Sequence, residues 1–241
     1  MATQMTFKRY EIKYMLSRAQ AASLKTEMGA HMALDRFGHS TIRNIYLDTD
    51  SFRLVRRSIE KPMYKEKLRV RAYDKAGPDD PVFVELKKKF DGVVYKRRLT
   101  LAHRAAMDAL EQGAPLPAIG QIACEIEAFR RFYGPTLAPA MFLSYEREAY
   151  FPTDGADFRL TLDENIRWRT DHIDLSGDCR GCALLRPDQV LMELKTPGGI
   201  PMWMVHFLSE HRIRKISFSK YGTAYGQMLA NDDMMGGKHY A

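Results

Sequence analysis

Charged side chains recur at every second position along six stretches of this sequence, and most of them are basic. Side chains two residues apart in a β-strand lie on the same face, so each stretch, once extended, presents its charges on one side. Apolar residues fill most of the alternate positions, as in a strand with one buried face. The pattern predicts antiparallel strands that share a cationic surface with a few carboxylates. The charged residues are Arg69, Arg71, Glu85, Lys87, Lys96, Arg98, Arg147, Arg159, Glu193 and Lys195.

Composition places the chain among globular proteins with anionic partners. It has 241 residues, of which 45% are hydrophobic, and a formal net charge of +7. Its apolar runs are shorter than the roughly 18–20 residues that cross a bilayer, and no secretory signal follows Met1. Three cysteines give no even disulfide framework, which favours a reducing compartment. We therefore expect one cytoplasmic domain over residues 1–241, with its core at about 7–230 and a frayed tail at 231–241.

Turn and cap signals divide the chain into strands and a few helices. Asp91-Gly92 is typical of a tight hairpin, and Asp48 to Ser51 predicts a turn or a helix cap. Ser17 is a predicted N-cap, and Gly29 ends the helix that follows it. The predicted strands are 7–15, 41–47, 64–73, 82–89, 93–101, 141–151, 158–162 and 189–196. The predicted helices are 18–28, two within 103–133 that separate around 113–117, then 202–209 and 221–230, and 168–187 is expected to be a long loop.

Several antiparallel strands with few helices must form a sandwich or close into a barrel. Two orientations of the charged faces stay open. The charges can face bulk water, in which case the surface is an ordinary solvated basic face. Alternatively, helices cover the apolar faces and the charges line a wet interior. The period of two does not separate these alternatives.

The charged pattern suits a phosphate polyanion. Arginine offers a fork that matches phosphate oxygens, and lysine a compact charge. The pairs Arg69/Arg71 and Lys96/Arg98 would form adjacent basic rows. Glu193, with Glu85 or Glu11, could hold Mg²⁺ or Mn²⁺, because hard cations take oxygen ligands. Phosphoryl transfer depends mainly on such positioning and charge neutralisation.

A second, weaker signal is Cys179-x-x-Cys182 with His172 upstream. This is a partial zinc spacing without an obvious fourth ligand, and reduced loop thiols are the alternative. Nucleic acid is a less favoured ligand, because few aromatic residues lie on the charged faces where bases could stack.

Seven short motifs occur in a fixed order along the chain. They are Arg9-Tyr10-Glu11-Ile12-Lys13-Tyr14, Leu68-Arg69-Val70-Arg71-Ala72-Tyr73, Val84-Glu85-Leu86-Lys87, Tyr95-Lys96-Arg97-Arg98, Arg159-Leu160-Thr161-Leu162-Asp163, Met192-Glu193-Leu194-Lys195 and Phe218-Ser219-Lys220-Tyr221. Together they resemble the VTC domain, the polyphosphate polymerase domain of the triphosphate tunnel metalloenzymes (CYTH-like proteins). The resemblance covers about residues 7 to 230. It implies an α+β fold: an antiparallel β-barrel around a basic tunnel, with helices packed around the outside.

The resemblance also implies an activity: transfer of the terminal phosphate of ATP to a growing polyphosphate chain, with Mn²⁺ or Mg²⁺. Arg69, Arg71, Lys220 and Glu193 would be catalytic. Glu193, with Glu85 and Glu11, would be the metal ligands. The phosphate-binding residues implied are Lys13, Lys87, Lys96, Arg98, Arg147, Arg159 and Lys195.

Two positions depart from the family pattern. Arg9 stands where the hydrolytic tunnel enzymes carry the first Glu of Glu-x-Glu-x-Lys, which argues against simple triphosphatase chemistry. Ser217 stands where polymerase members tend to have a second Lys, and Lys215 is a possible substitute if its segment is extended. The alternatives are a triphosphate or polyphosphate hydrolase of the same fold and a non-catalytic module that binds polyphosphate or inositol phosphates. Export of a polymer would need a separate membrane protein, which would recruit this chain to the inner face of the membrane.

Overall fold

The computed structural model describes residues 10–91 and 93–234. Within them, ten strands and six α-helices form two compact units. Unit 1 comprises Met1–Thr41, Tyr145–Ile166 and Leu185–Phe218, and unit 2 comprises Ile42–Ser144, Arg167–Leu184 and Ser219–Ala241. Three long strands, β2 (Met32–Asp48), β6 (Ala138–Pro152) and β7 (Arg159–Arg169), contribute residues to both units.

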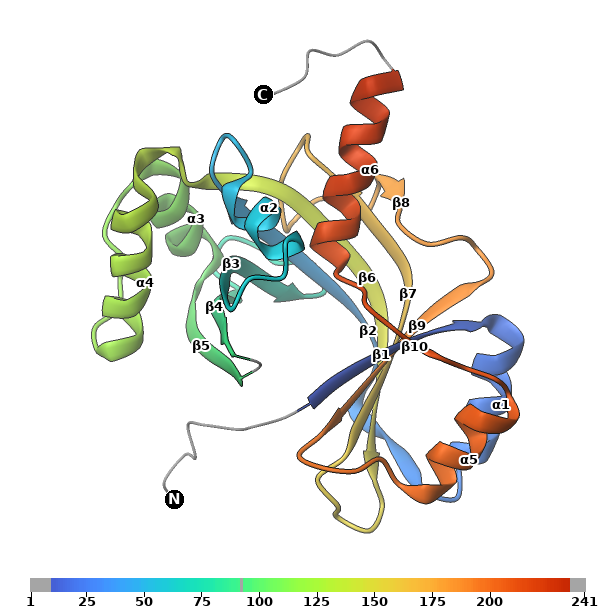
Figure 1. Ribbon diagram of the computed structural model, residues 1–241. Helices are drawn as coiled ribbons and strands as arrows, with labels where there is room; N and C mark the ends of the chain where they lie inside the picture. The colour runs from blue at the N-terminus through green and yellow to red at the C-terminus, as the bar shows by residue number, and fades with distance from the viewer. Residues whose placement is uncertain (1–9, 92, 235–241) are drawn as a thin grey trace. The chain divides into compact units, whose positions relative to one another are not determined.

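Unit 1 is a sheet whose apolar face is covered by two helices. Its strands β1 (Tyr10–Ser17), β9 (Gln189–Thr196) and β10 (Lys215–Ile216) are antiparallel, in the order β10-β1-β9-β7. Helices α1 (Arg18–Met28) and α5 (Met202–Glu210) lie beside each other next to these strands (Figure 1). The core contains Leu24 of α1 and Met204 of α5 against Leu160 and Leu194 of the sheet. The other face is left to the charged residues.

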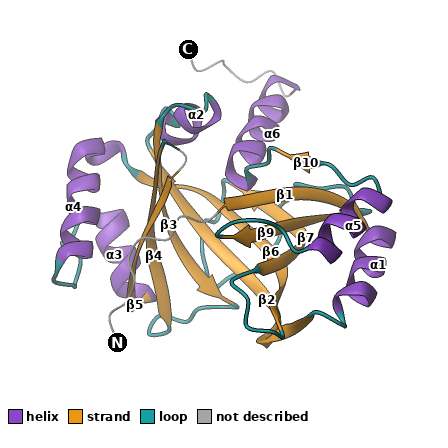
Figure 2. Ribbon diagram, turned by 60° about the horizontal axis from the view of Figure 1, so that its bottom comes forward, coloured by secondary structure: helices purple, strands orange, loops and turns teal. Residues whose placement is uncertain are grey.

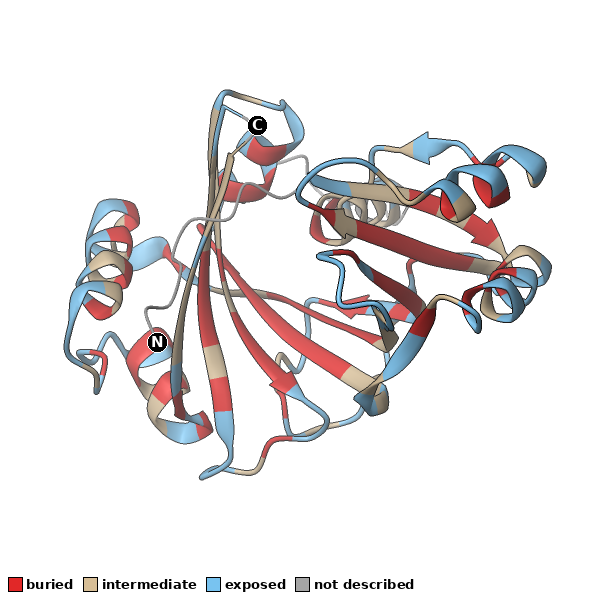
Figure 3. Ribbon diagram, turned by 90° about the horizontal axis from the view of Figure 1, so that it is seen from below, coloured by how far each residue is buried: buried red, intermediate tan, exposed pale blue. Residues whose placement is uncertain are grey.

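Unit 2 has a similar arrangement, on strands that belong to the same hydrogen-bonded sheet. Strands β3 (Tyr64–Tyr73), β4 (Pro81–Phe90) and β5 (Val93–Ala102) follow β2 in consecutive antiparallel pairs. Helices α3 (His103–Gln112) and α4 (Gln121–Tyr133) run along one side of these strands (Figure 2). Ala106 and Ile126 of these helices pack with Val70, Val84 and other apolar strand residues. Much of β3 and β4 is buried (Figure 3), and the buried residues include Arg71 and Glu85 as well as the apolar positions beside them.

The remaining elements of unit 2 are short or peripheral. They are α2 (Arg53–Ile59), a 3₁₀ turn (Gly134–Thr136), β8 (Cys182–Ala183), which pairs with β7, and α6 (Lys220–Met234). None of the helices within the described residues combines the length and the apolar character needed to cross a membrane.

The sequence-based fold class is confirmed: antiparallel strands carry helices on their apolar faces. Strand β3 and helix α1 have the predicted bounds, and Ser17 caps α1 in a capping box with Gln20. Strand β2 begins at Met32, well before the predicted residue 41, and β7 continues to Arg169. Helix α6 extends to Met234, so the predicted frayed tail begins inside a helix, and residues 235–241 lie outside the described part. The single domain over 1–241 stays a prediction.

Candidate functional site

The charged face of unit 2 results from the register in which β3, β4 and β5 pair. In the antiparallel pairs, Arg69 lies opposite Glu85, and Glu85 lies opposite Arg98. The next row along the same face is Lys67, Lys87 and Lys96. Because the alternate residues of these strands are buried under α3 and α4, the cations all lie on the opposite face. Adjacent strands are about 5 Å apart, so these rows form a continuous basic surface.

Glu85 is the centre of this surface. Its side chain is 1% exposed, and Arg69 donates from Nε at 2.9 Å to Oε2, which Arg69 Nη2 also approaches to 2.8 Å. Arg98 donates from Nε at 2.8 Å to Oε1, which Lys96 Nζ also approaches to 2.6 Å. Arg71 Nε is 4.0 Å from Oε2. One carboxylate therefore holds four predicted phosphate-binding or catalytic cations in fixed positions.

The cations keep Glu85 ionised and make Lys96 easier to deprotonate. Burial alone would raise the pKa of Glu85, but the charges of Arg69, Arg71 and Lys96 outweigh it and hold that pKa well below its usual range. Partial burial lowers the pKa of Lys96 to about 8, against the opposing effect of Glu85 and with the help of Arg98 and Arg69. At neutral pH the cluster therefore carries a clear excess of positive charge.

Two residues of β2 that were not predicted as site residues complete the surface. Asn44 Oδ1 accepts a hydrogen bond from Arg71 Nε at 3.0 Å, and Tyr46 Oη accepts one from Arg69 Nη1 at 3.2 Å. Burial raises the pKa of Tyr46, but the cations Arg69, Lys67 and Arg71 outweigh this effect and lower the pKa to about 8. A sequence signal existed, since Asn44 and Tyr46 alternate with apolar residues in the predicted strand 41–47.

Tyr46 connects the basic surface to helices α2 and α6. Its ring stacks on that of Tyr221, with centroids 4.4 Å apart. Tyr221 donates from Oη at 2.8 Å to Asp48 Oδ2. Asp48 also accepts from the backbone amides of Leu54 and Val55 in the first turn of α2, at 2.8 and 2.9 Å, although the N-cap residue of this helix is Phe52. The sequence predicted a turn or a helix cap at Asp48 to Ser51, but it did not predict α2 itself.

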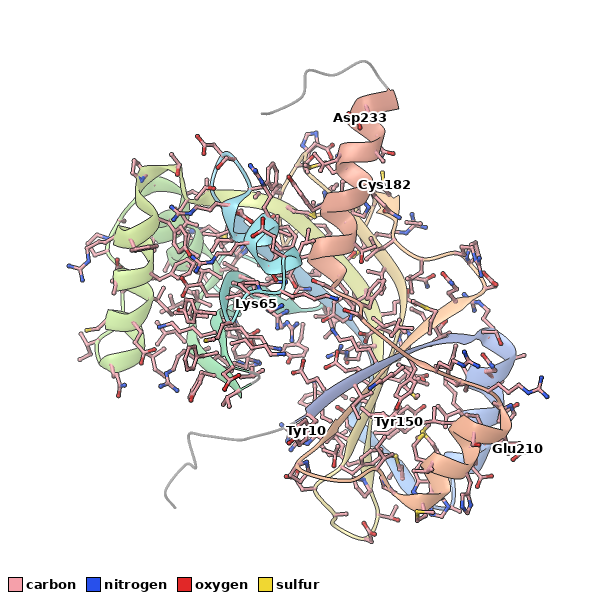
Figure 4. All side chains as sticks on the ribbon, in the orientation of Figure 1. Tyr10, Lys65, Tyr150, Cys182, Glu210 and Asp233 are labelled. Carbon is pink, nitrogen blue, oxygen red and sulfur yellow. The ribbon has the colours of Figure 1, made fainter. Side chains whose placement is uncertain are left out.

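Two lysines flank this network. Lys220, a predicted catalytic residue, is the first residue of α6 and is half-buried in unit 2. Lys65, labelled in Figure 4, donates from Nζ at 3.2 Å to the carbonyl of Ser58 in α2. The start of α6 is therefore positioned by the residue after Lys220, because Tyr221 is bonded to Asp48.

The charged face of unit 1 centres on Glu193. Glu193 is 7% exposed and lies opposite Lys13 on β1 and Thr161 on β7. Lys195 Nζ is 3.1 Å from Glu193 Oε1, and Lys13 Nζ is 3.9 Å from Oε2. Lys13 also donates to the carbonyl of Phe218 at 2.9 Å. These residues share the face that α1 and α5 leave uncovered.

Arg147 and Arg159 have different surroundings on this unit. Arg147 donates from Nε at 2.6 Å and from Nη2 at 2.7 Å to the two oxygens of Asp163, which is 0% exposed. Burial would lower the pKa of Arg147, but Asp163 outweighs it and holds that pKa well above its usual value. The guanidinium of Arg159 lies 4.8 Å from the centroid of the Phe151 ring. Asp163 was missed although it follows Arg159 at an interval of four on the same face.

A divalent metal fits the carboxylates of unit 1 better than Glu85. Glu11 lies opposite Lys195, so it is the diagonal neighbour of Glu193 on the same face. Mg²⁺ is commonly held by one or two carboxylates together with substrate phosphates. Both oxygens of Glu85, by contrast, already accept from cations, which does not fit its predicted role as a metal ligand. No group of three or more His, Cys, Asp or Glu able to hold a metal ion occurs among residues 10–91 and 93–234.

Three further sequence predictions have clear placements. Cys179 is half-buried and Cys182, labelled in Figure 4, is exposed on β8; both are free thiols. Lys215 lies opposite Tyr14, on the apolar side of β1, and so does not share the face of Lys13. It is therefore not a substitute for the missing lysine at Ser217. Arg9 lies outside the described residues.

Comparison with models of protein families shows which family the chain belongs to. The model of the VTC domain matches residues 8–229, which is nearly the whole sequence and runs through both units. The chain belongs to the VTC domain family. The family resemblance found in the motifs is thereby confirmed. The search of curated proteins finds no match for this VTC domain.

Solved structures show the fold that this VTC domain shares. An adenylate cyclase-like protein from Bacillus halodurans is similar, with a TM-score of 0.57 and 18% identity over 90% of this chain and 96% of that chain. An adenylyl cyclase-like protein from Hippeastrum, described as having a dominant triphosphatase activity, has a TM-score of 0.54 and 14% identity over 90% of this chain and 96% of that chain. At these identities the likeness concerns the fold: this VTC domain has the triphosphate tunnel fold.

Proposed function

We propose that this VTC domain is a metal-dependent polyphosphate polymerase that transfers the terminal phosphate of ATP to a growing polyphosphate chain. Membership of the VTC family supports this function. The acceptor is a condensed phosphate, which carries about one negative charge per phosphoryl unit. A protein that holds such a chain needs cations in rows, with few acids between them.

The observation that carries the proposal is the charge balance on the face of unit 2. Six cations on β3, β4 and β5 lie around one carboxylate, and that carboxylate is saturated by them. Such an excess of positive charge lowers the stability of the folded protein by mutual repulsion unless an anion neutralises it. The cations are Lys67, Arg69, Arg71, Lys87, Lys96 and Arg98. Fixed guanidinium groups of this kind stabilise the charge that develops on a transferred phosphoryl group.

Unit 1 supplies the proposed metal ligands and further phosphate contacts. Glu193 and Glu11 would hold Mg²⁺ or Mn²⁺, which neutralises phosphate oxygens and orients them. Lys13 and Lys195 flank Glu193 and would contact the same phosphates. Arg147 is fixed by Asp163, so it offers a pre-oriented charge and no proton. A separate membrane protein would be needed for export of the product.

Neighbouring lysines on opposite faces of β4 provide a matched test. Lys87 lies on the basic face, whereas Lys88 is on the other face with its Nζ 3.6 Å from Glu125. Purified protein is incubated with ATP and Mn²⁺, and the products are separated on a gel that resolves polyphosphate. Lys87→Gln should reduce polymer formation and polyphosphate affinity, and Lys88→Gln should leave both close to wild type. Equal effects of the two changes would contradict the proposed face.

Hydrolysis of triphosphate or polyphosphate is the second candidate, since the Hippeastrum protein of this fold has triphosphatase activity. Release of free phosphate without polymer in the same assay would favour it. Neither product, with polyphosphate binding retained, would favour a binding module for polyphosphate or inositol phosphates. Displacement of short polyphosphate by single-stranded nucleic acid at equal charge would instead point to a nucleic-acid ligand.

A further inference from the structure

Thr161, on the charged face of unit 1, carries a buried hydroxyl that the structure leaves unpaired. The residue is 7% exposed, and its Oγ1 is enclosed by protein without a hydrogen-bond partner among the described residues. The alternate residues Leu160 and Leu162 lie in the apolar core, so Thr161 belongs to the charged face. A buried polar group without a partner lowers stability, which indicates that this hydroxyl has a partner in another state of the protein.

Glu193 is the acceptor that the strand register places beside this hydroxyl. Thr161 and Glu193 are direct partners in the pair of β7 and β9, where opposite Cβ atoms are about 4.5–5.5 Å apart. Asp163, the next residue of β7 on the same face, already has its two oxygens bonded to Arg147 at 2.6 and 2.7 Å. Arg159, the preceding residue on this face, is only a donor. Glu193 is therefore the acid that Thr161 can serve.

Two lysines occupy the Glu193 carboxylate in the structure. Lys195 Nζ is 3.1 Å from Oε1, and Lys13 Nζ is 3.9 Å from Oε2. Lys13 lies on β1, and β1 and β7 border β9 on opposite sides, so this lysine approaches from the side away from Thr161. Neither carboxylate oxygen is within hydrogen-bond distance of Thr161 Oγ1. The carboxylate is therefore engaged by cations, while the hydroxyl on its β7 side is unused.

We propose that Thr161 is a positioning residue for Glu193: its hydroxyl donates a hydrogen bond to this carboxylate when Glu193 holds the divalent metal ion. The inference rests on the proposed role of Glu193 as a metal ligand. The ammonium groups of Lys13 and Lys195 are repelled by a bound cation, which leaves one carboxylate oxygen open to a new donor. Carboxylates that bind metals are generally fixed by such a hydrogen bond from a neighbouring group. A neutral hydroxyl suits this place because it adds no positive charge next to the ion.

Titration of the full chain with Mn²⁺, without nucleotide and followed by the electron paramagnetic resonance signal of the free ion, tests the proposal. Thr161→Val should weaken Mn²⁺ binding by about tenfold, at the lower end of the effect of residues that support a metal ligand. Thr161→Ser keeps the hydroxyl and should bind Mn²⁺ nearly as well as the wild type. Glu193→Gln should lose most of the binding, and adding Thr161→Val to it should have no further effect.

Thermal melting without metal separates this role from a purely structural one. Thr161→Val removes an unpaired buried hydroxyl, so its Tm should equal or exceed that of the wild type. Thr196→Val is the matched control, because Thr196 is a buried threonine on the other face of β9 whose hydroxyl is satisfied. It donates to the carbonyl of Gly199 at 2.8 Å and accepts from the amide of Gly198 at 3.2 Å. Thr196→Val should therefore lower the Tm and leave Mn²⁺ binding unchanged.

The outcomes distinguish a failure of this inference from a failure of the proposed function. Equal Mn²⁺ affinities of the wild type and Thr161→Val, with binding lost in Glu193→Gln, would overturn the role of Thr161 and leave Glu193 as a metal ligand. Unchanged Mn²⁺ binding in Glu193→Gln would overturn both. Weaker polyphosphate binding by Thr161→Val in the presence of a chelator, with Mn²⁺ affinity unchanged, would assign the hydroxyl to phosphate instead. The expected Mn²⁺ affinities without any polymer formation would support the role of Thr161 and contradict the polymerase alone.

Discussion

Arg69 and Glu85 lie directly opposite each other on β3 and β4, and a hydrogen bond of 2.9 Å and an ion-pair contact of 2.8 Å join them on an almost fully buried carboxylate. Arg98 binds the same carboxylate from the other neighbouring strand. The main effect of Glu85 is therefore to hold these arginines in place. Its competition with an anionic ligand for them is secondary. The surface that we propose for polyphosphate is organised around this one acid.

Replacement of Glu85 should lower the free energy of unfolding by more than the loss of an ordinary ion pair does. Glu85→Gln leaves mutually repelling cations around a neutral amide, and breaking a buried pair costs about 3–5 kcal/mol. Glu125→Gln is the matched control, because Glu125 is a half-buried acid of α4 that binds Arg97 at 3.1 Å on the opposite face of the same strands, and its loss should cost about 1 kcal/mol. Urea unfolding with and without polyphosphate measures both, and equal costs would contradict the central role of Glu85.

The same variant has a predictable pH signature. The pKa of Glu85 in the folded chain lies below its usual value of 4.5, so its stabilising effect is complete at neutral pH and is lost as the pH falls below that value. Glu85→Gln should therefore reduce the loss of stability between neutral pH and acid. A pH series of urea midpoints, which remains parallel in the two proteins if Glu85 is not perturbed, checks this expectation.

Polyphosphate affinity should decline as the pH rises above about 8, the value to which the pKa values of both Lys96 and Tyr46 are shifted. Deprotonation of Lys96 removes a positive charge, and deprotonation of Tyr46 adds a negative one, so both weaken the binding of an anion. Lys96→Arg keeps its charge at every pH in this range and should flatten the decline. Combination with Tyr46→Phe should flatten it further. Affinity measured from pH 7 to 9.5 tests this, and an unchanged profile in the double variant would exclude both residues as its source.

The sequence predicted the strands of this domain wherever one face is buried. Strands β3, β4 and β5 were found almost to the residue, because apolar and charged positions alternate along them. The first half of β2 is largely exposed and rich in polar residues such as Asp35, Arg36 and His39, so no alternation marks it. Helix α2 spans only Arg53–Ile59, its N-cap residue Phe52 provides no side-chain cap, and the carboxylate that bonds to its first turn, Asp48, lies several residues before it. Neither the first half of β2 nor helix α2 therefore has a local sequence pattern that predicts it.

The sequence predicted which face of each strand carries the charged residues, but it did not predict which of these residues form ion pairs with each other. Period two showed that Arg69, Glu85 and Arg98 lie on the charged sides of their strands. It could not show that β3, β4 and β5 pair in a register that directs both arginines onto Glu85, because register depends on contacts between strands. For the same reason Glu85 was interpreted as a metal ligand. Asp163, bonded to Arg147 from another strand, ends one of the quoted motifs but was not named as a site residue.

Arg147 should depend on Asp163 for its placement. Asp163→Asn removes the charge that compensates a buried guanidinium, and the cost should be about 3–5 kcal/mol. Glu148→Gln is the control, since Glu148 is a partly exposed acid of the same unit that binds Lys25 at 2.6 Å and should contribute at most about 1 kcal/mol. Chemical denaturation compares the two. If Asp163→Asn lowers the free energy of unfolding by no more than the control does, Arg147 is stabilised by other contacts.

Tyr221 should couple the start of α6 to the basic surface through two separable contacts. Tyr221→Phe removes the hydrogen bond to Asp48 and keeps the stacked ring beside Tyr46, so the stability should fall by about 1 kcal/mol while polyphosphate affinity stays near wild type. Tyr221→Leu also removes the ring that supports Tyr46, the partner of Arg69. We expect this second variant to lose affinity as well as stability, because Arg69 is then less well oriented. Calorimetry with a short polyphosphate at a temperature where both variants are folded measures the difference. Equal affinities in the two variants would show that the stacked pair supports the fold alone.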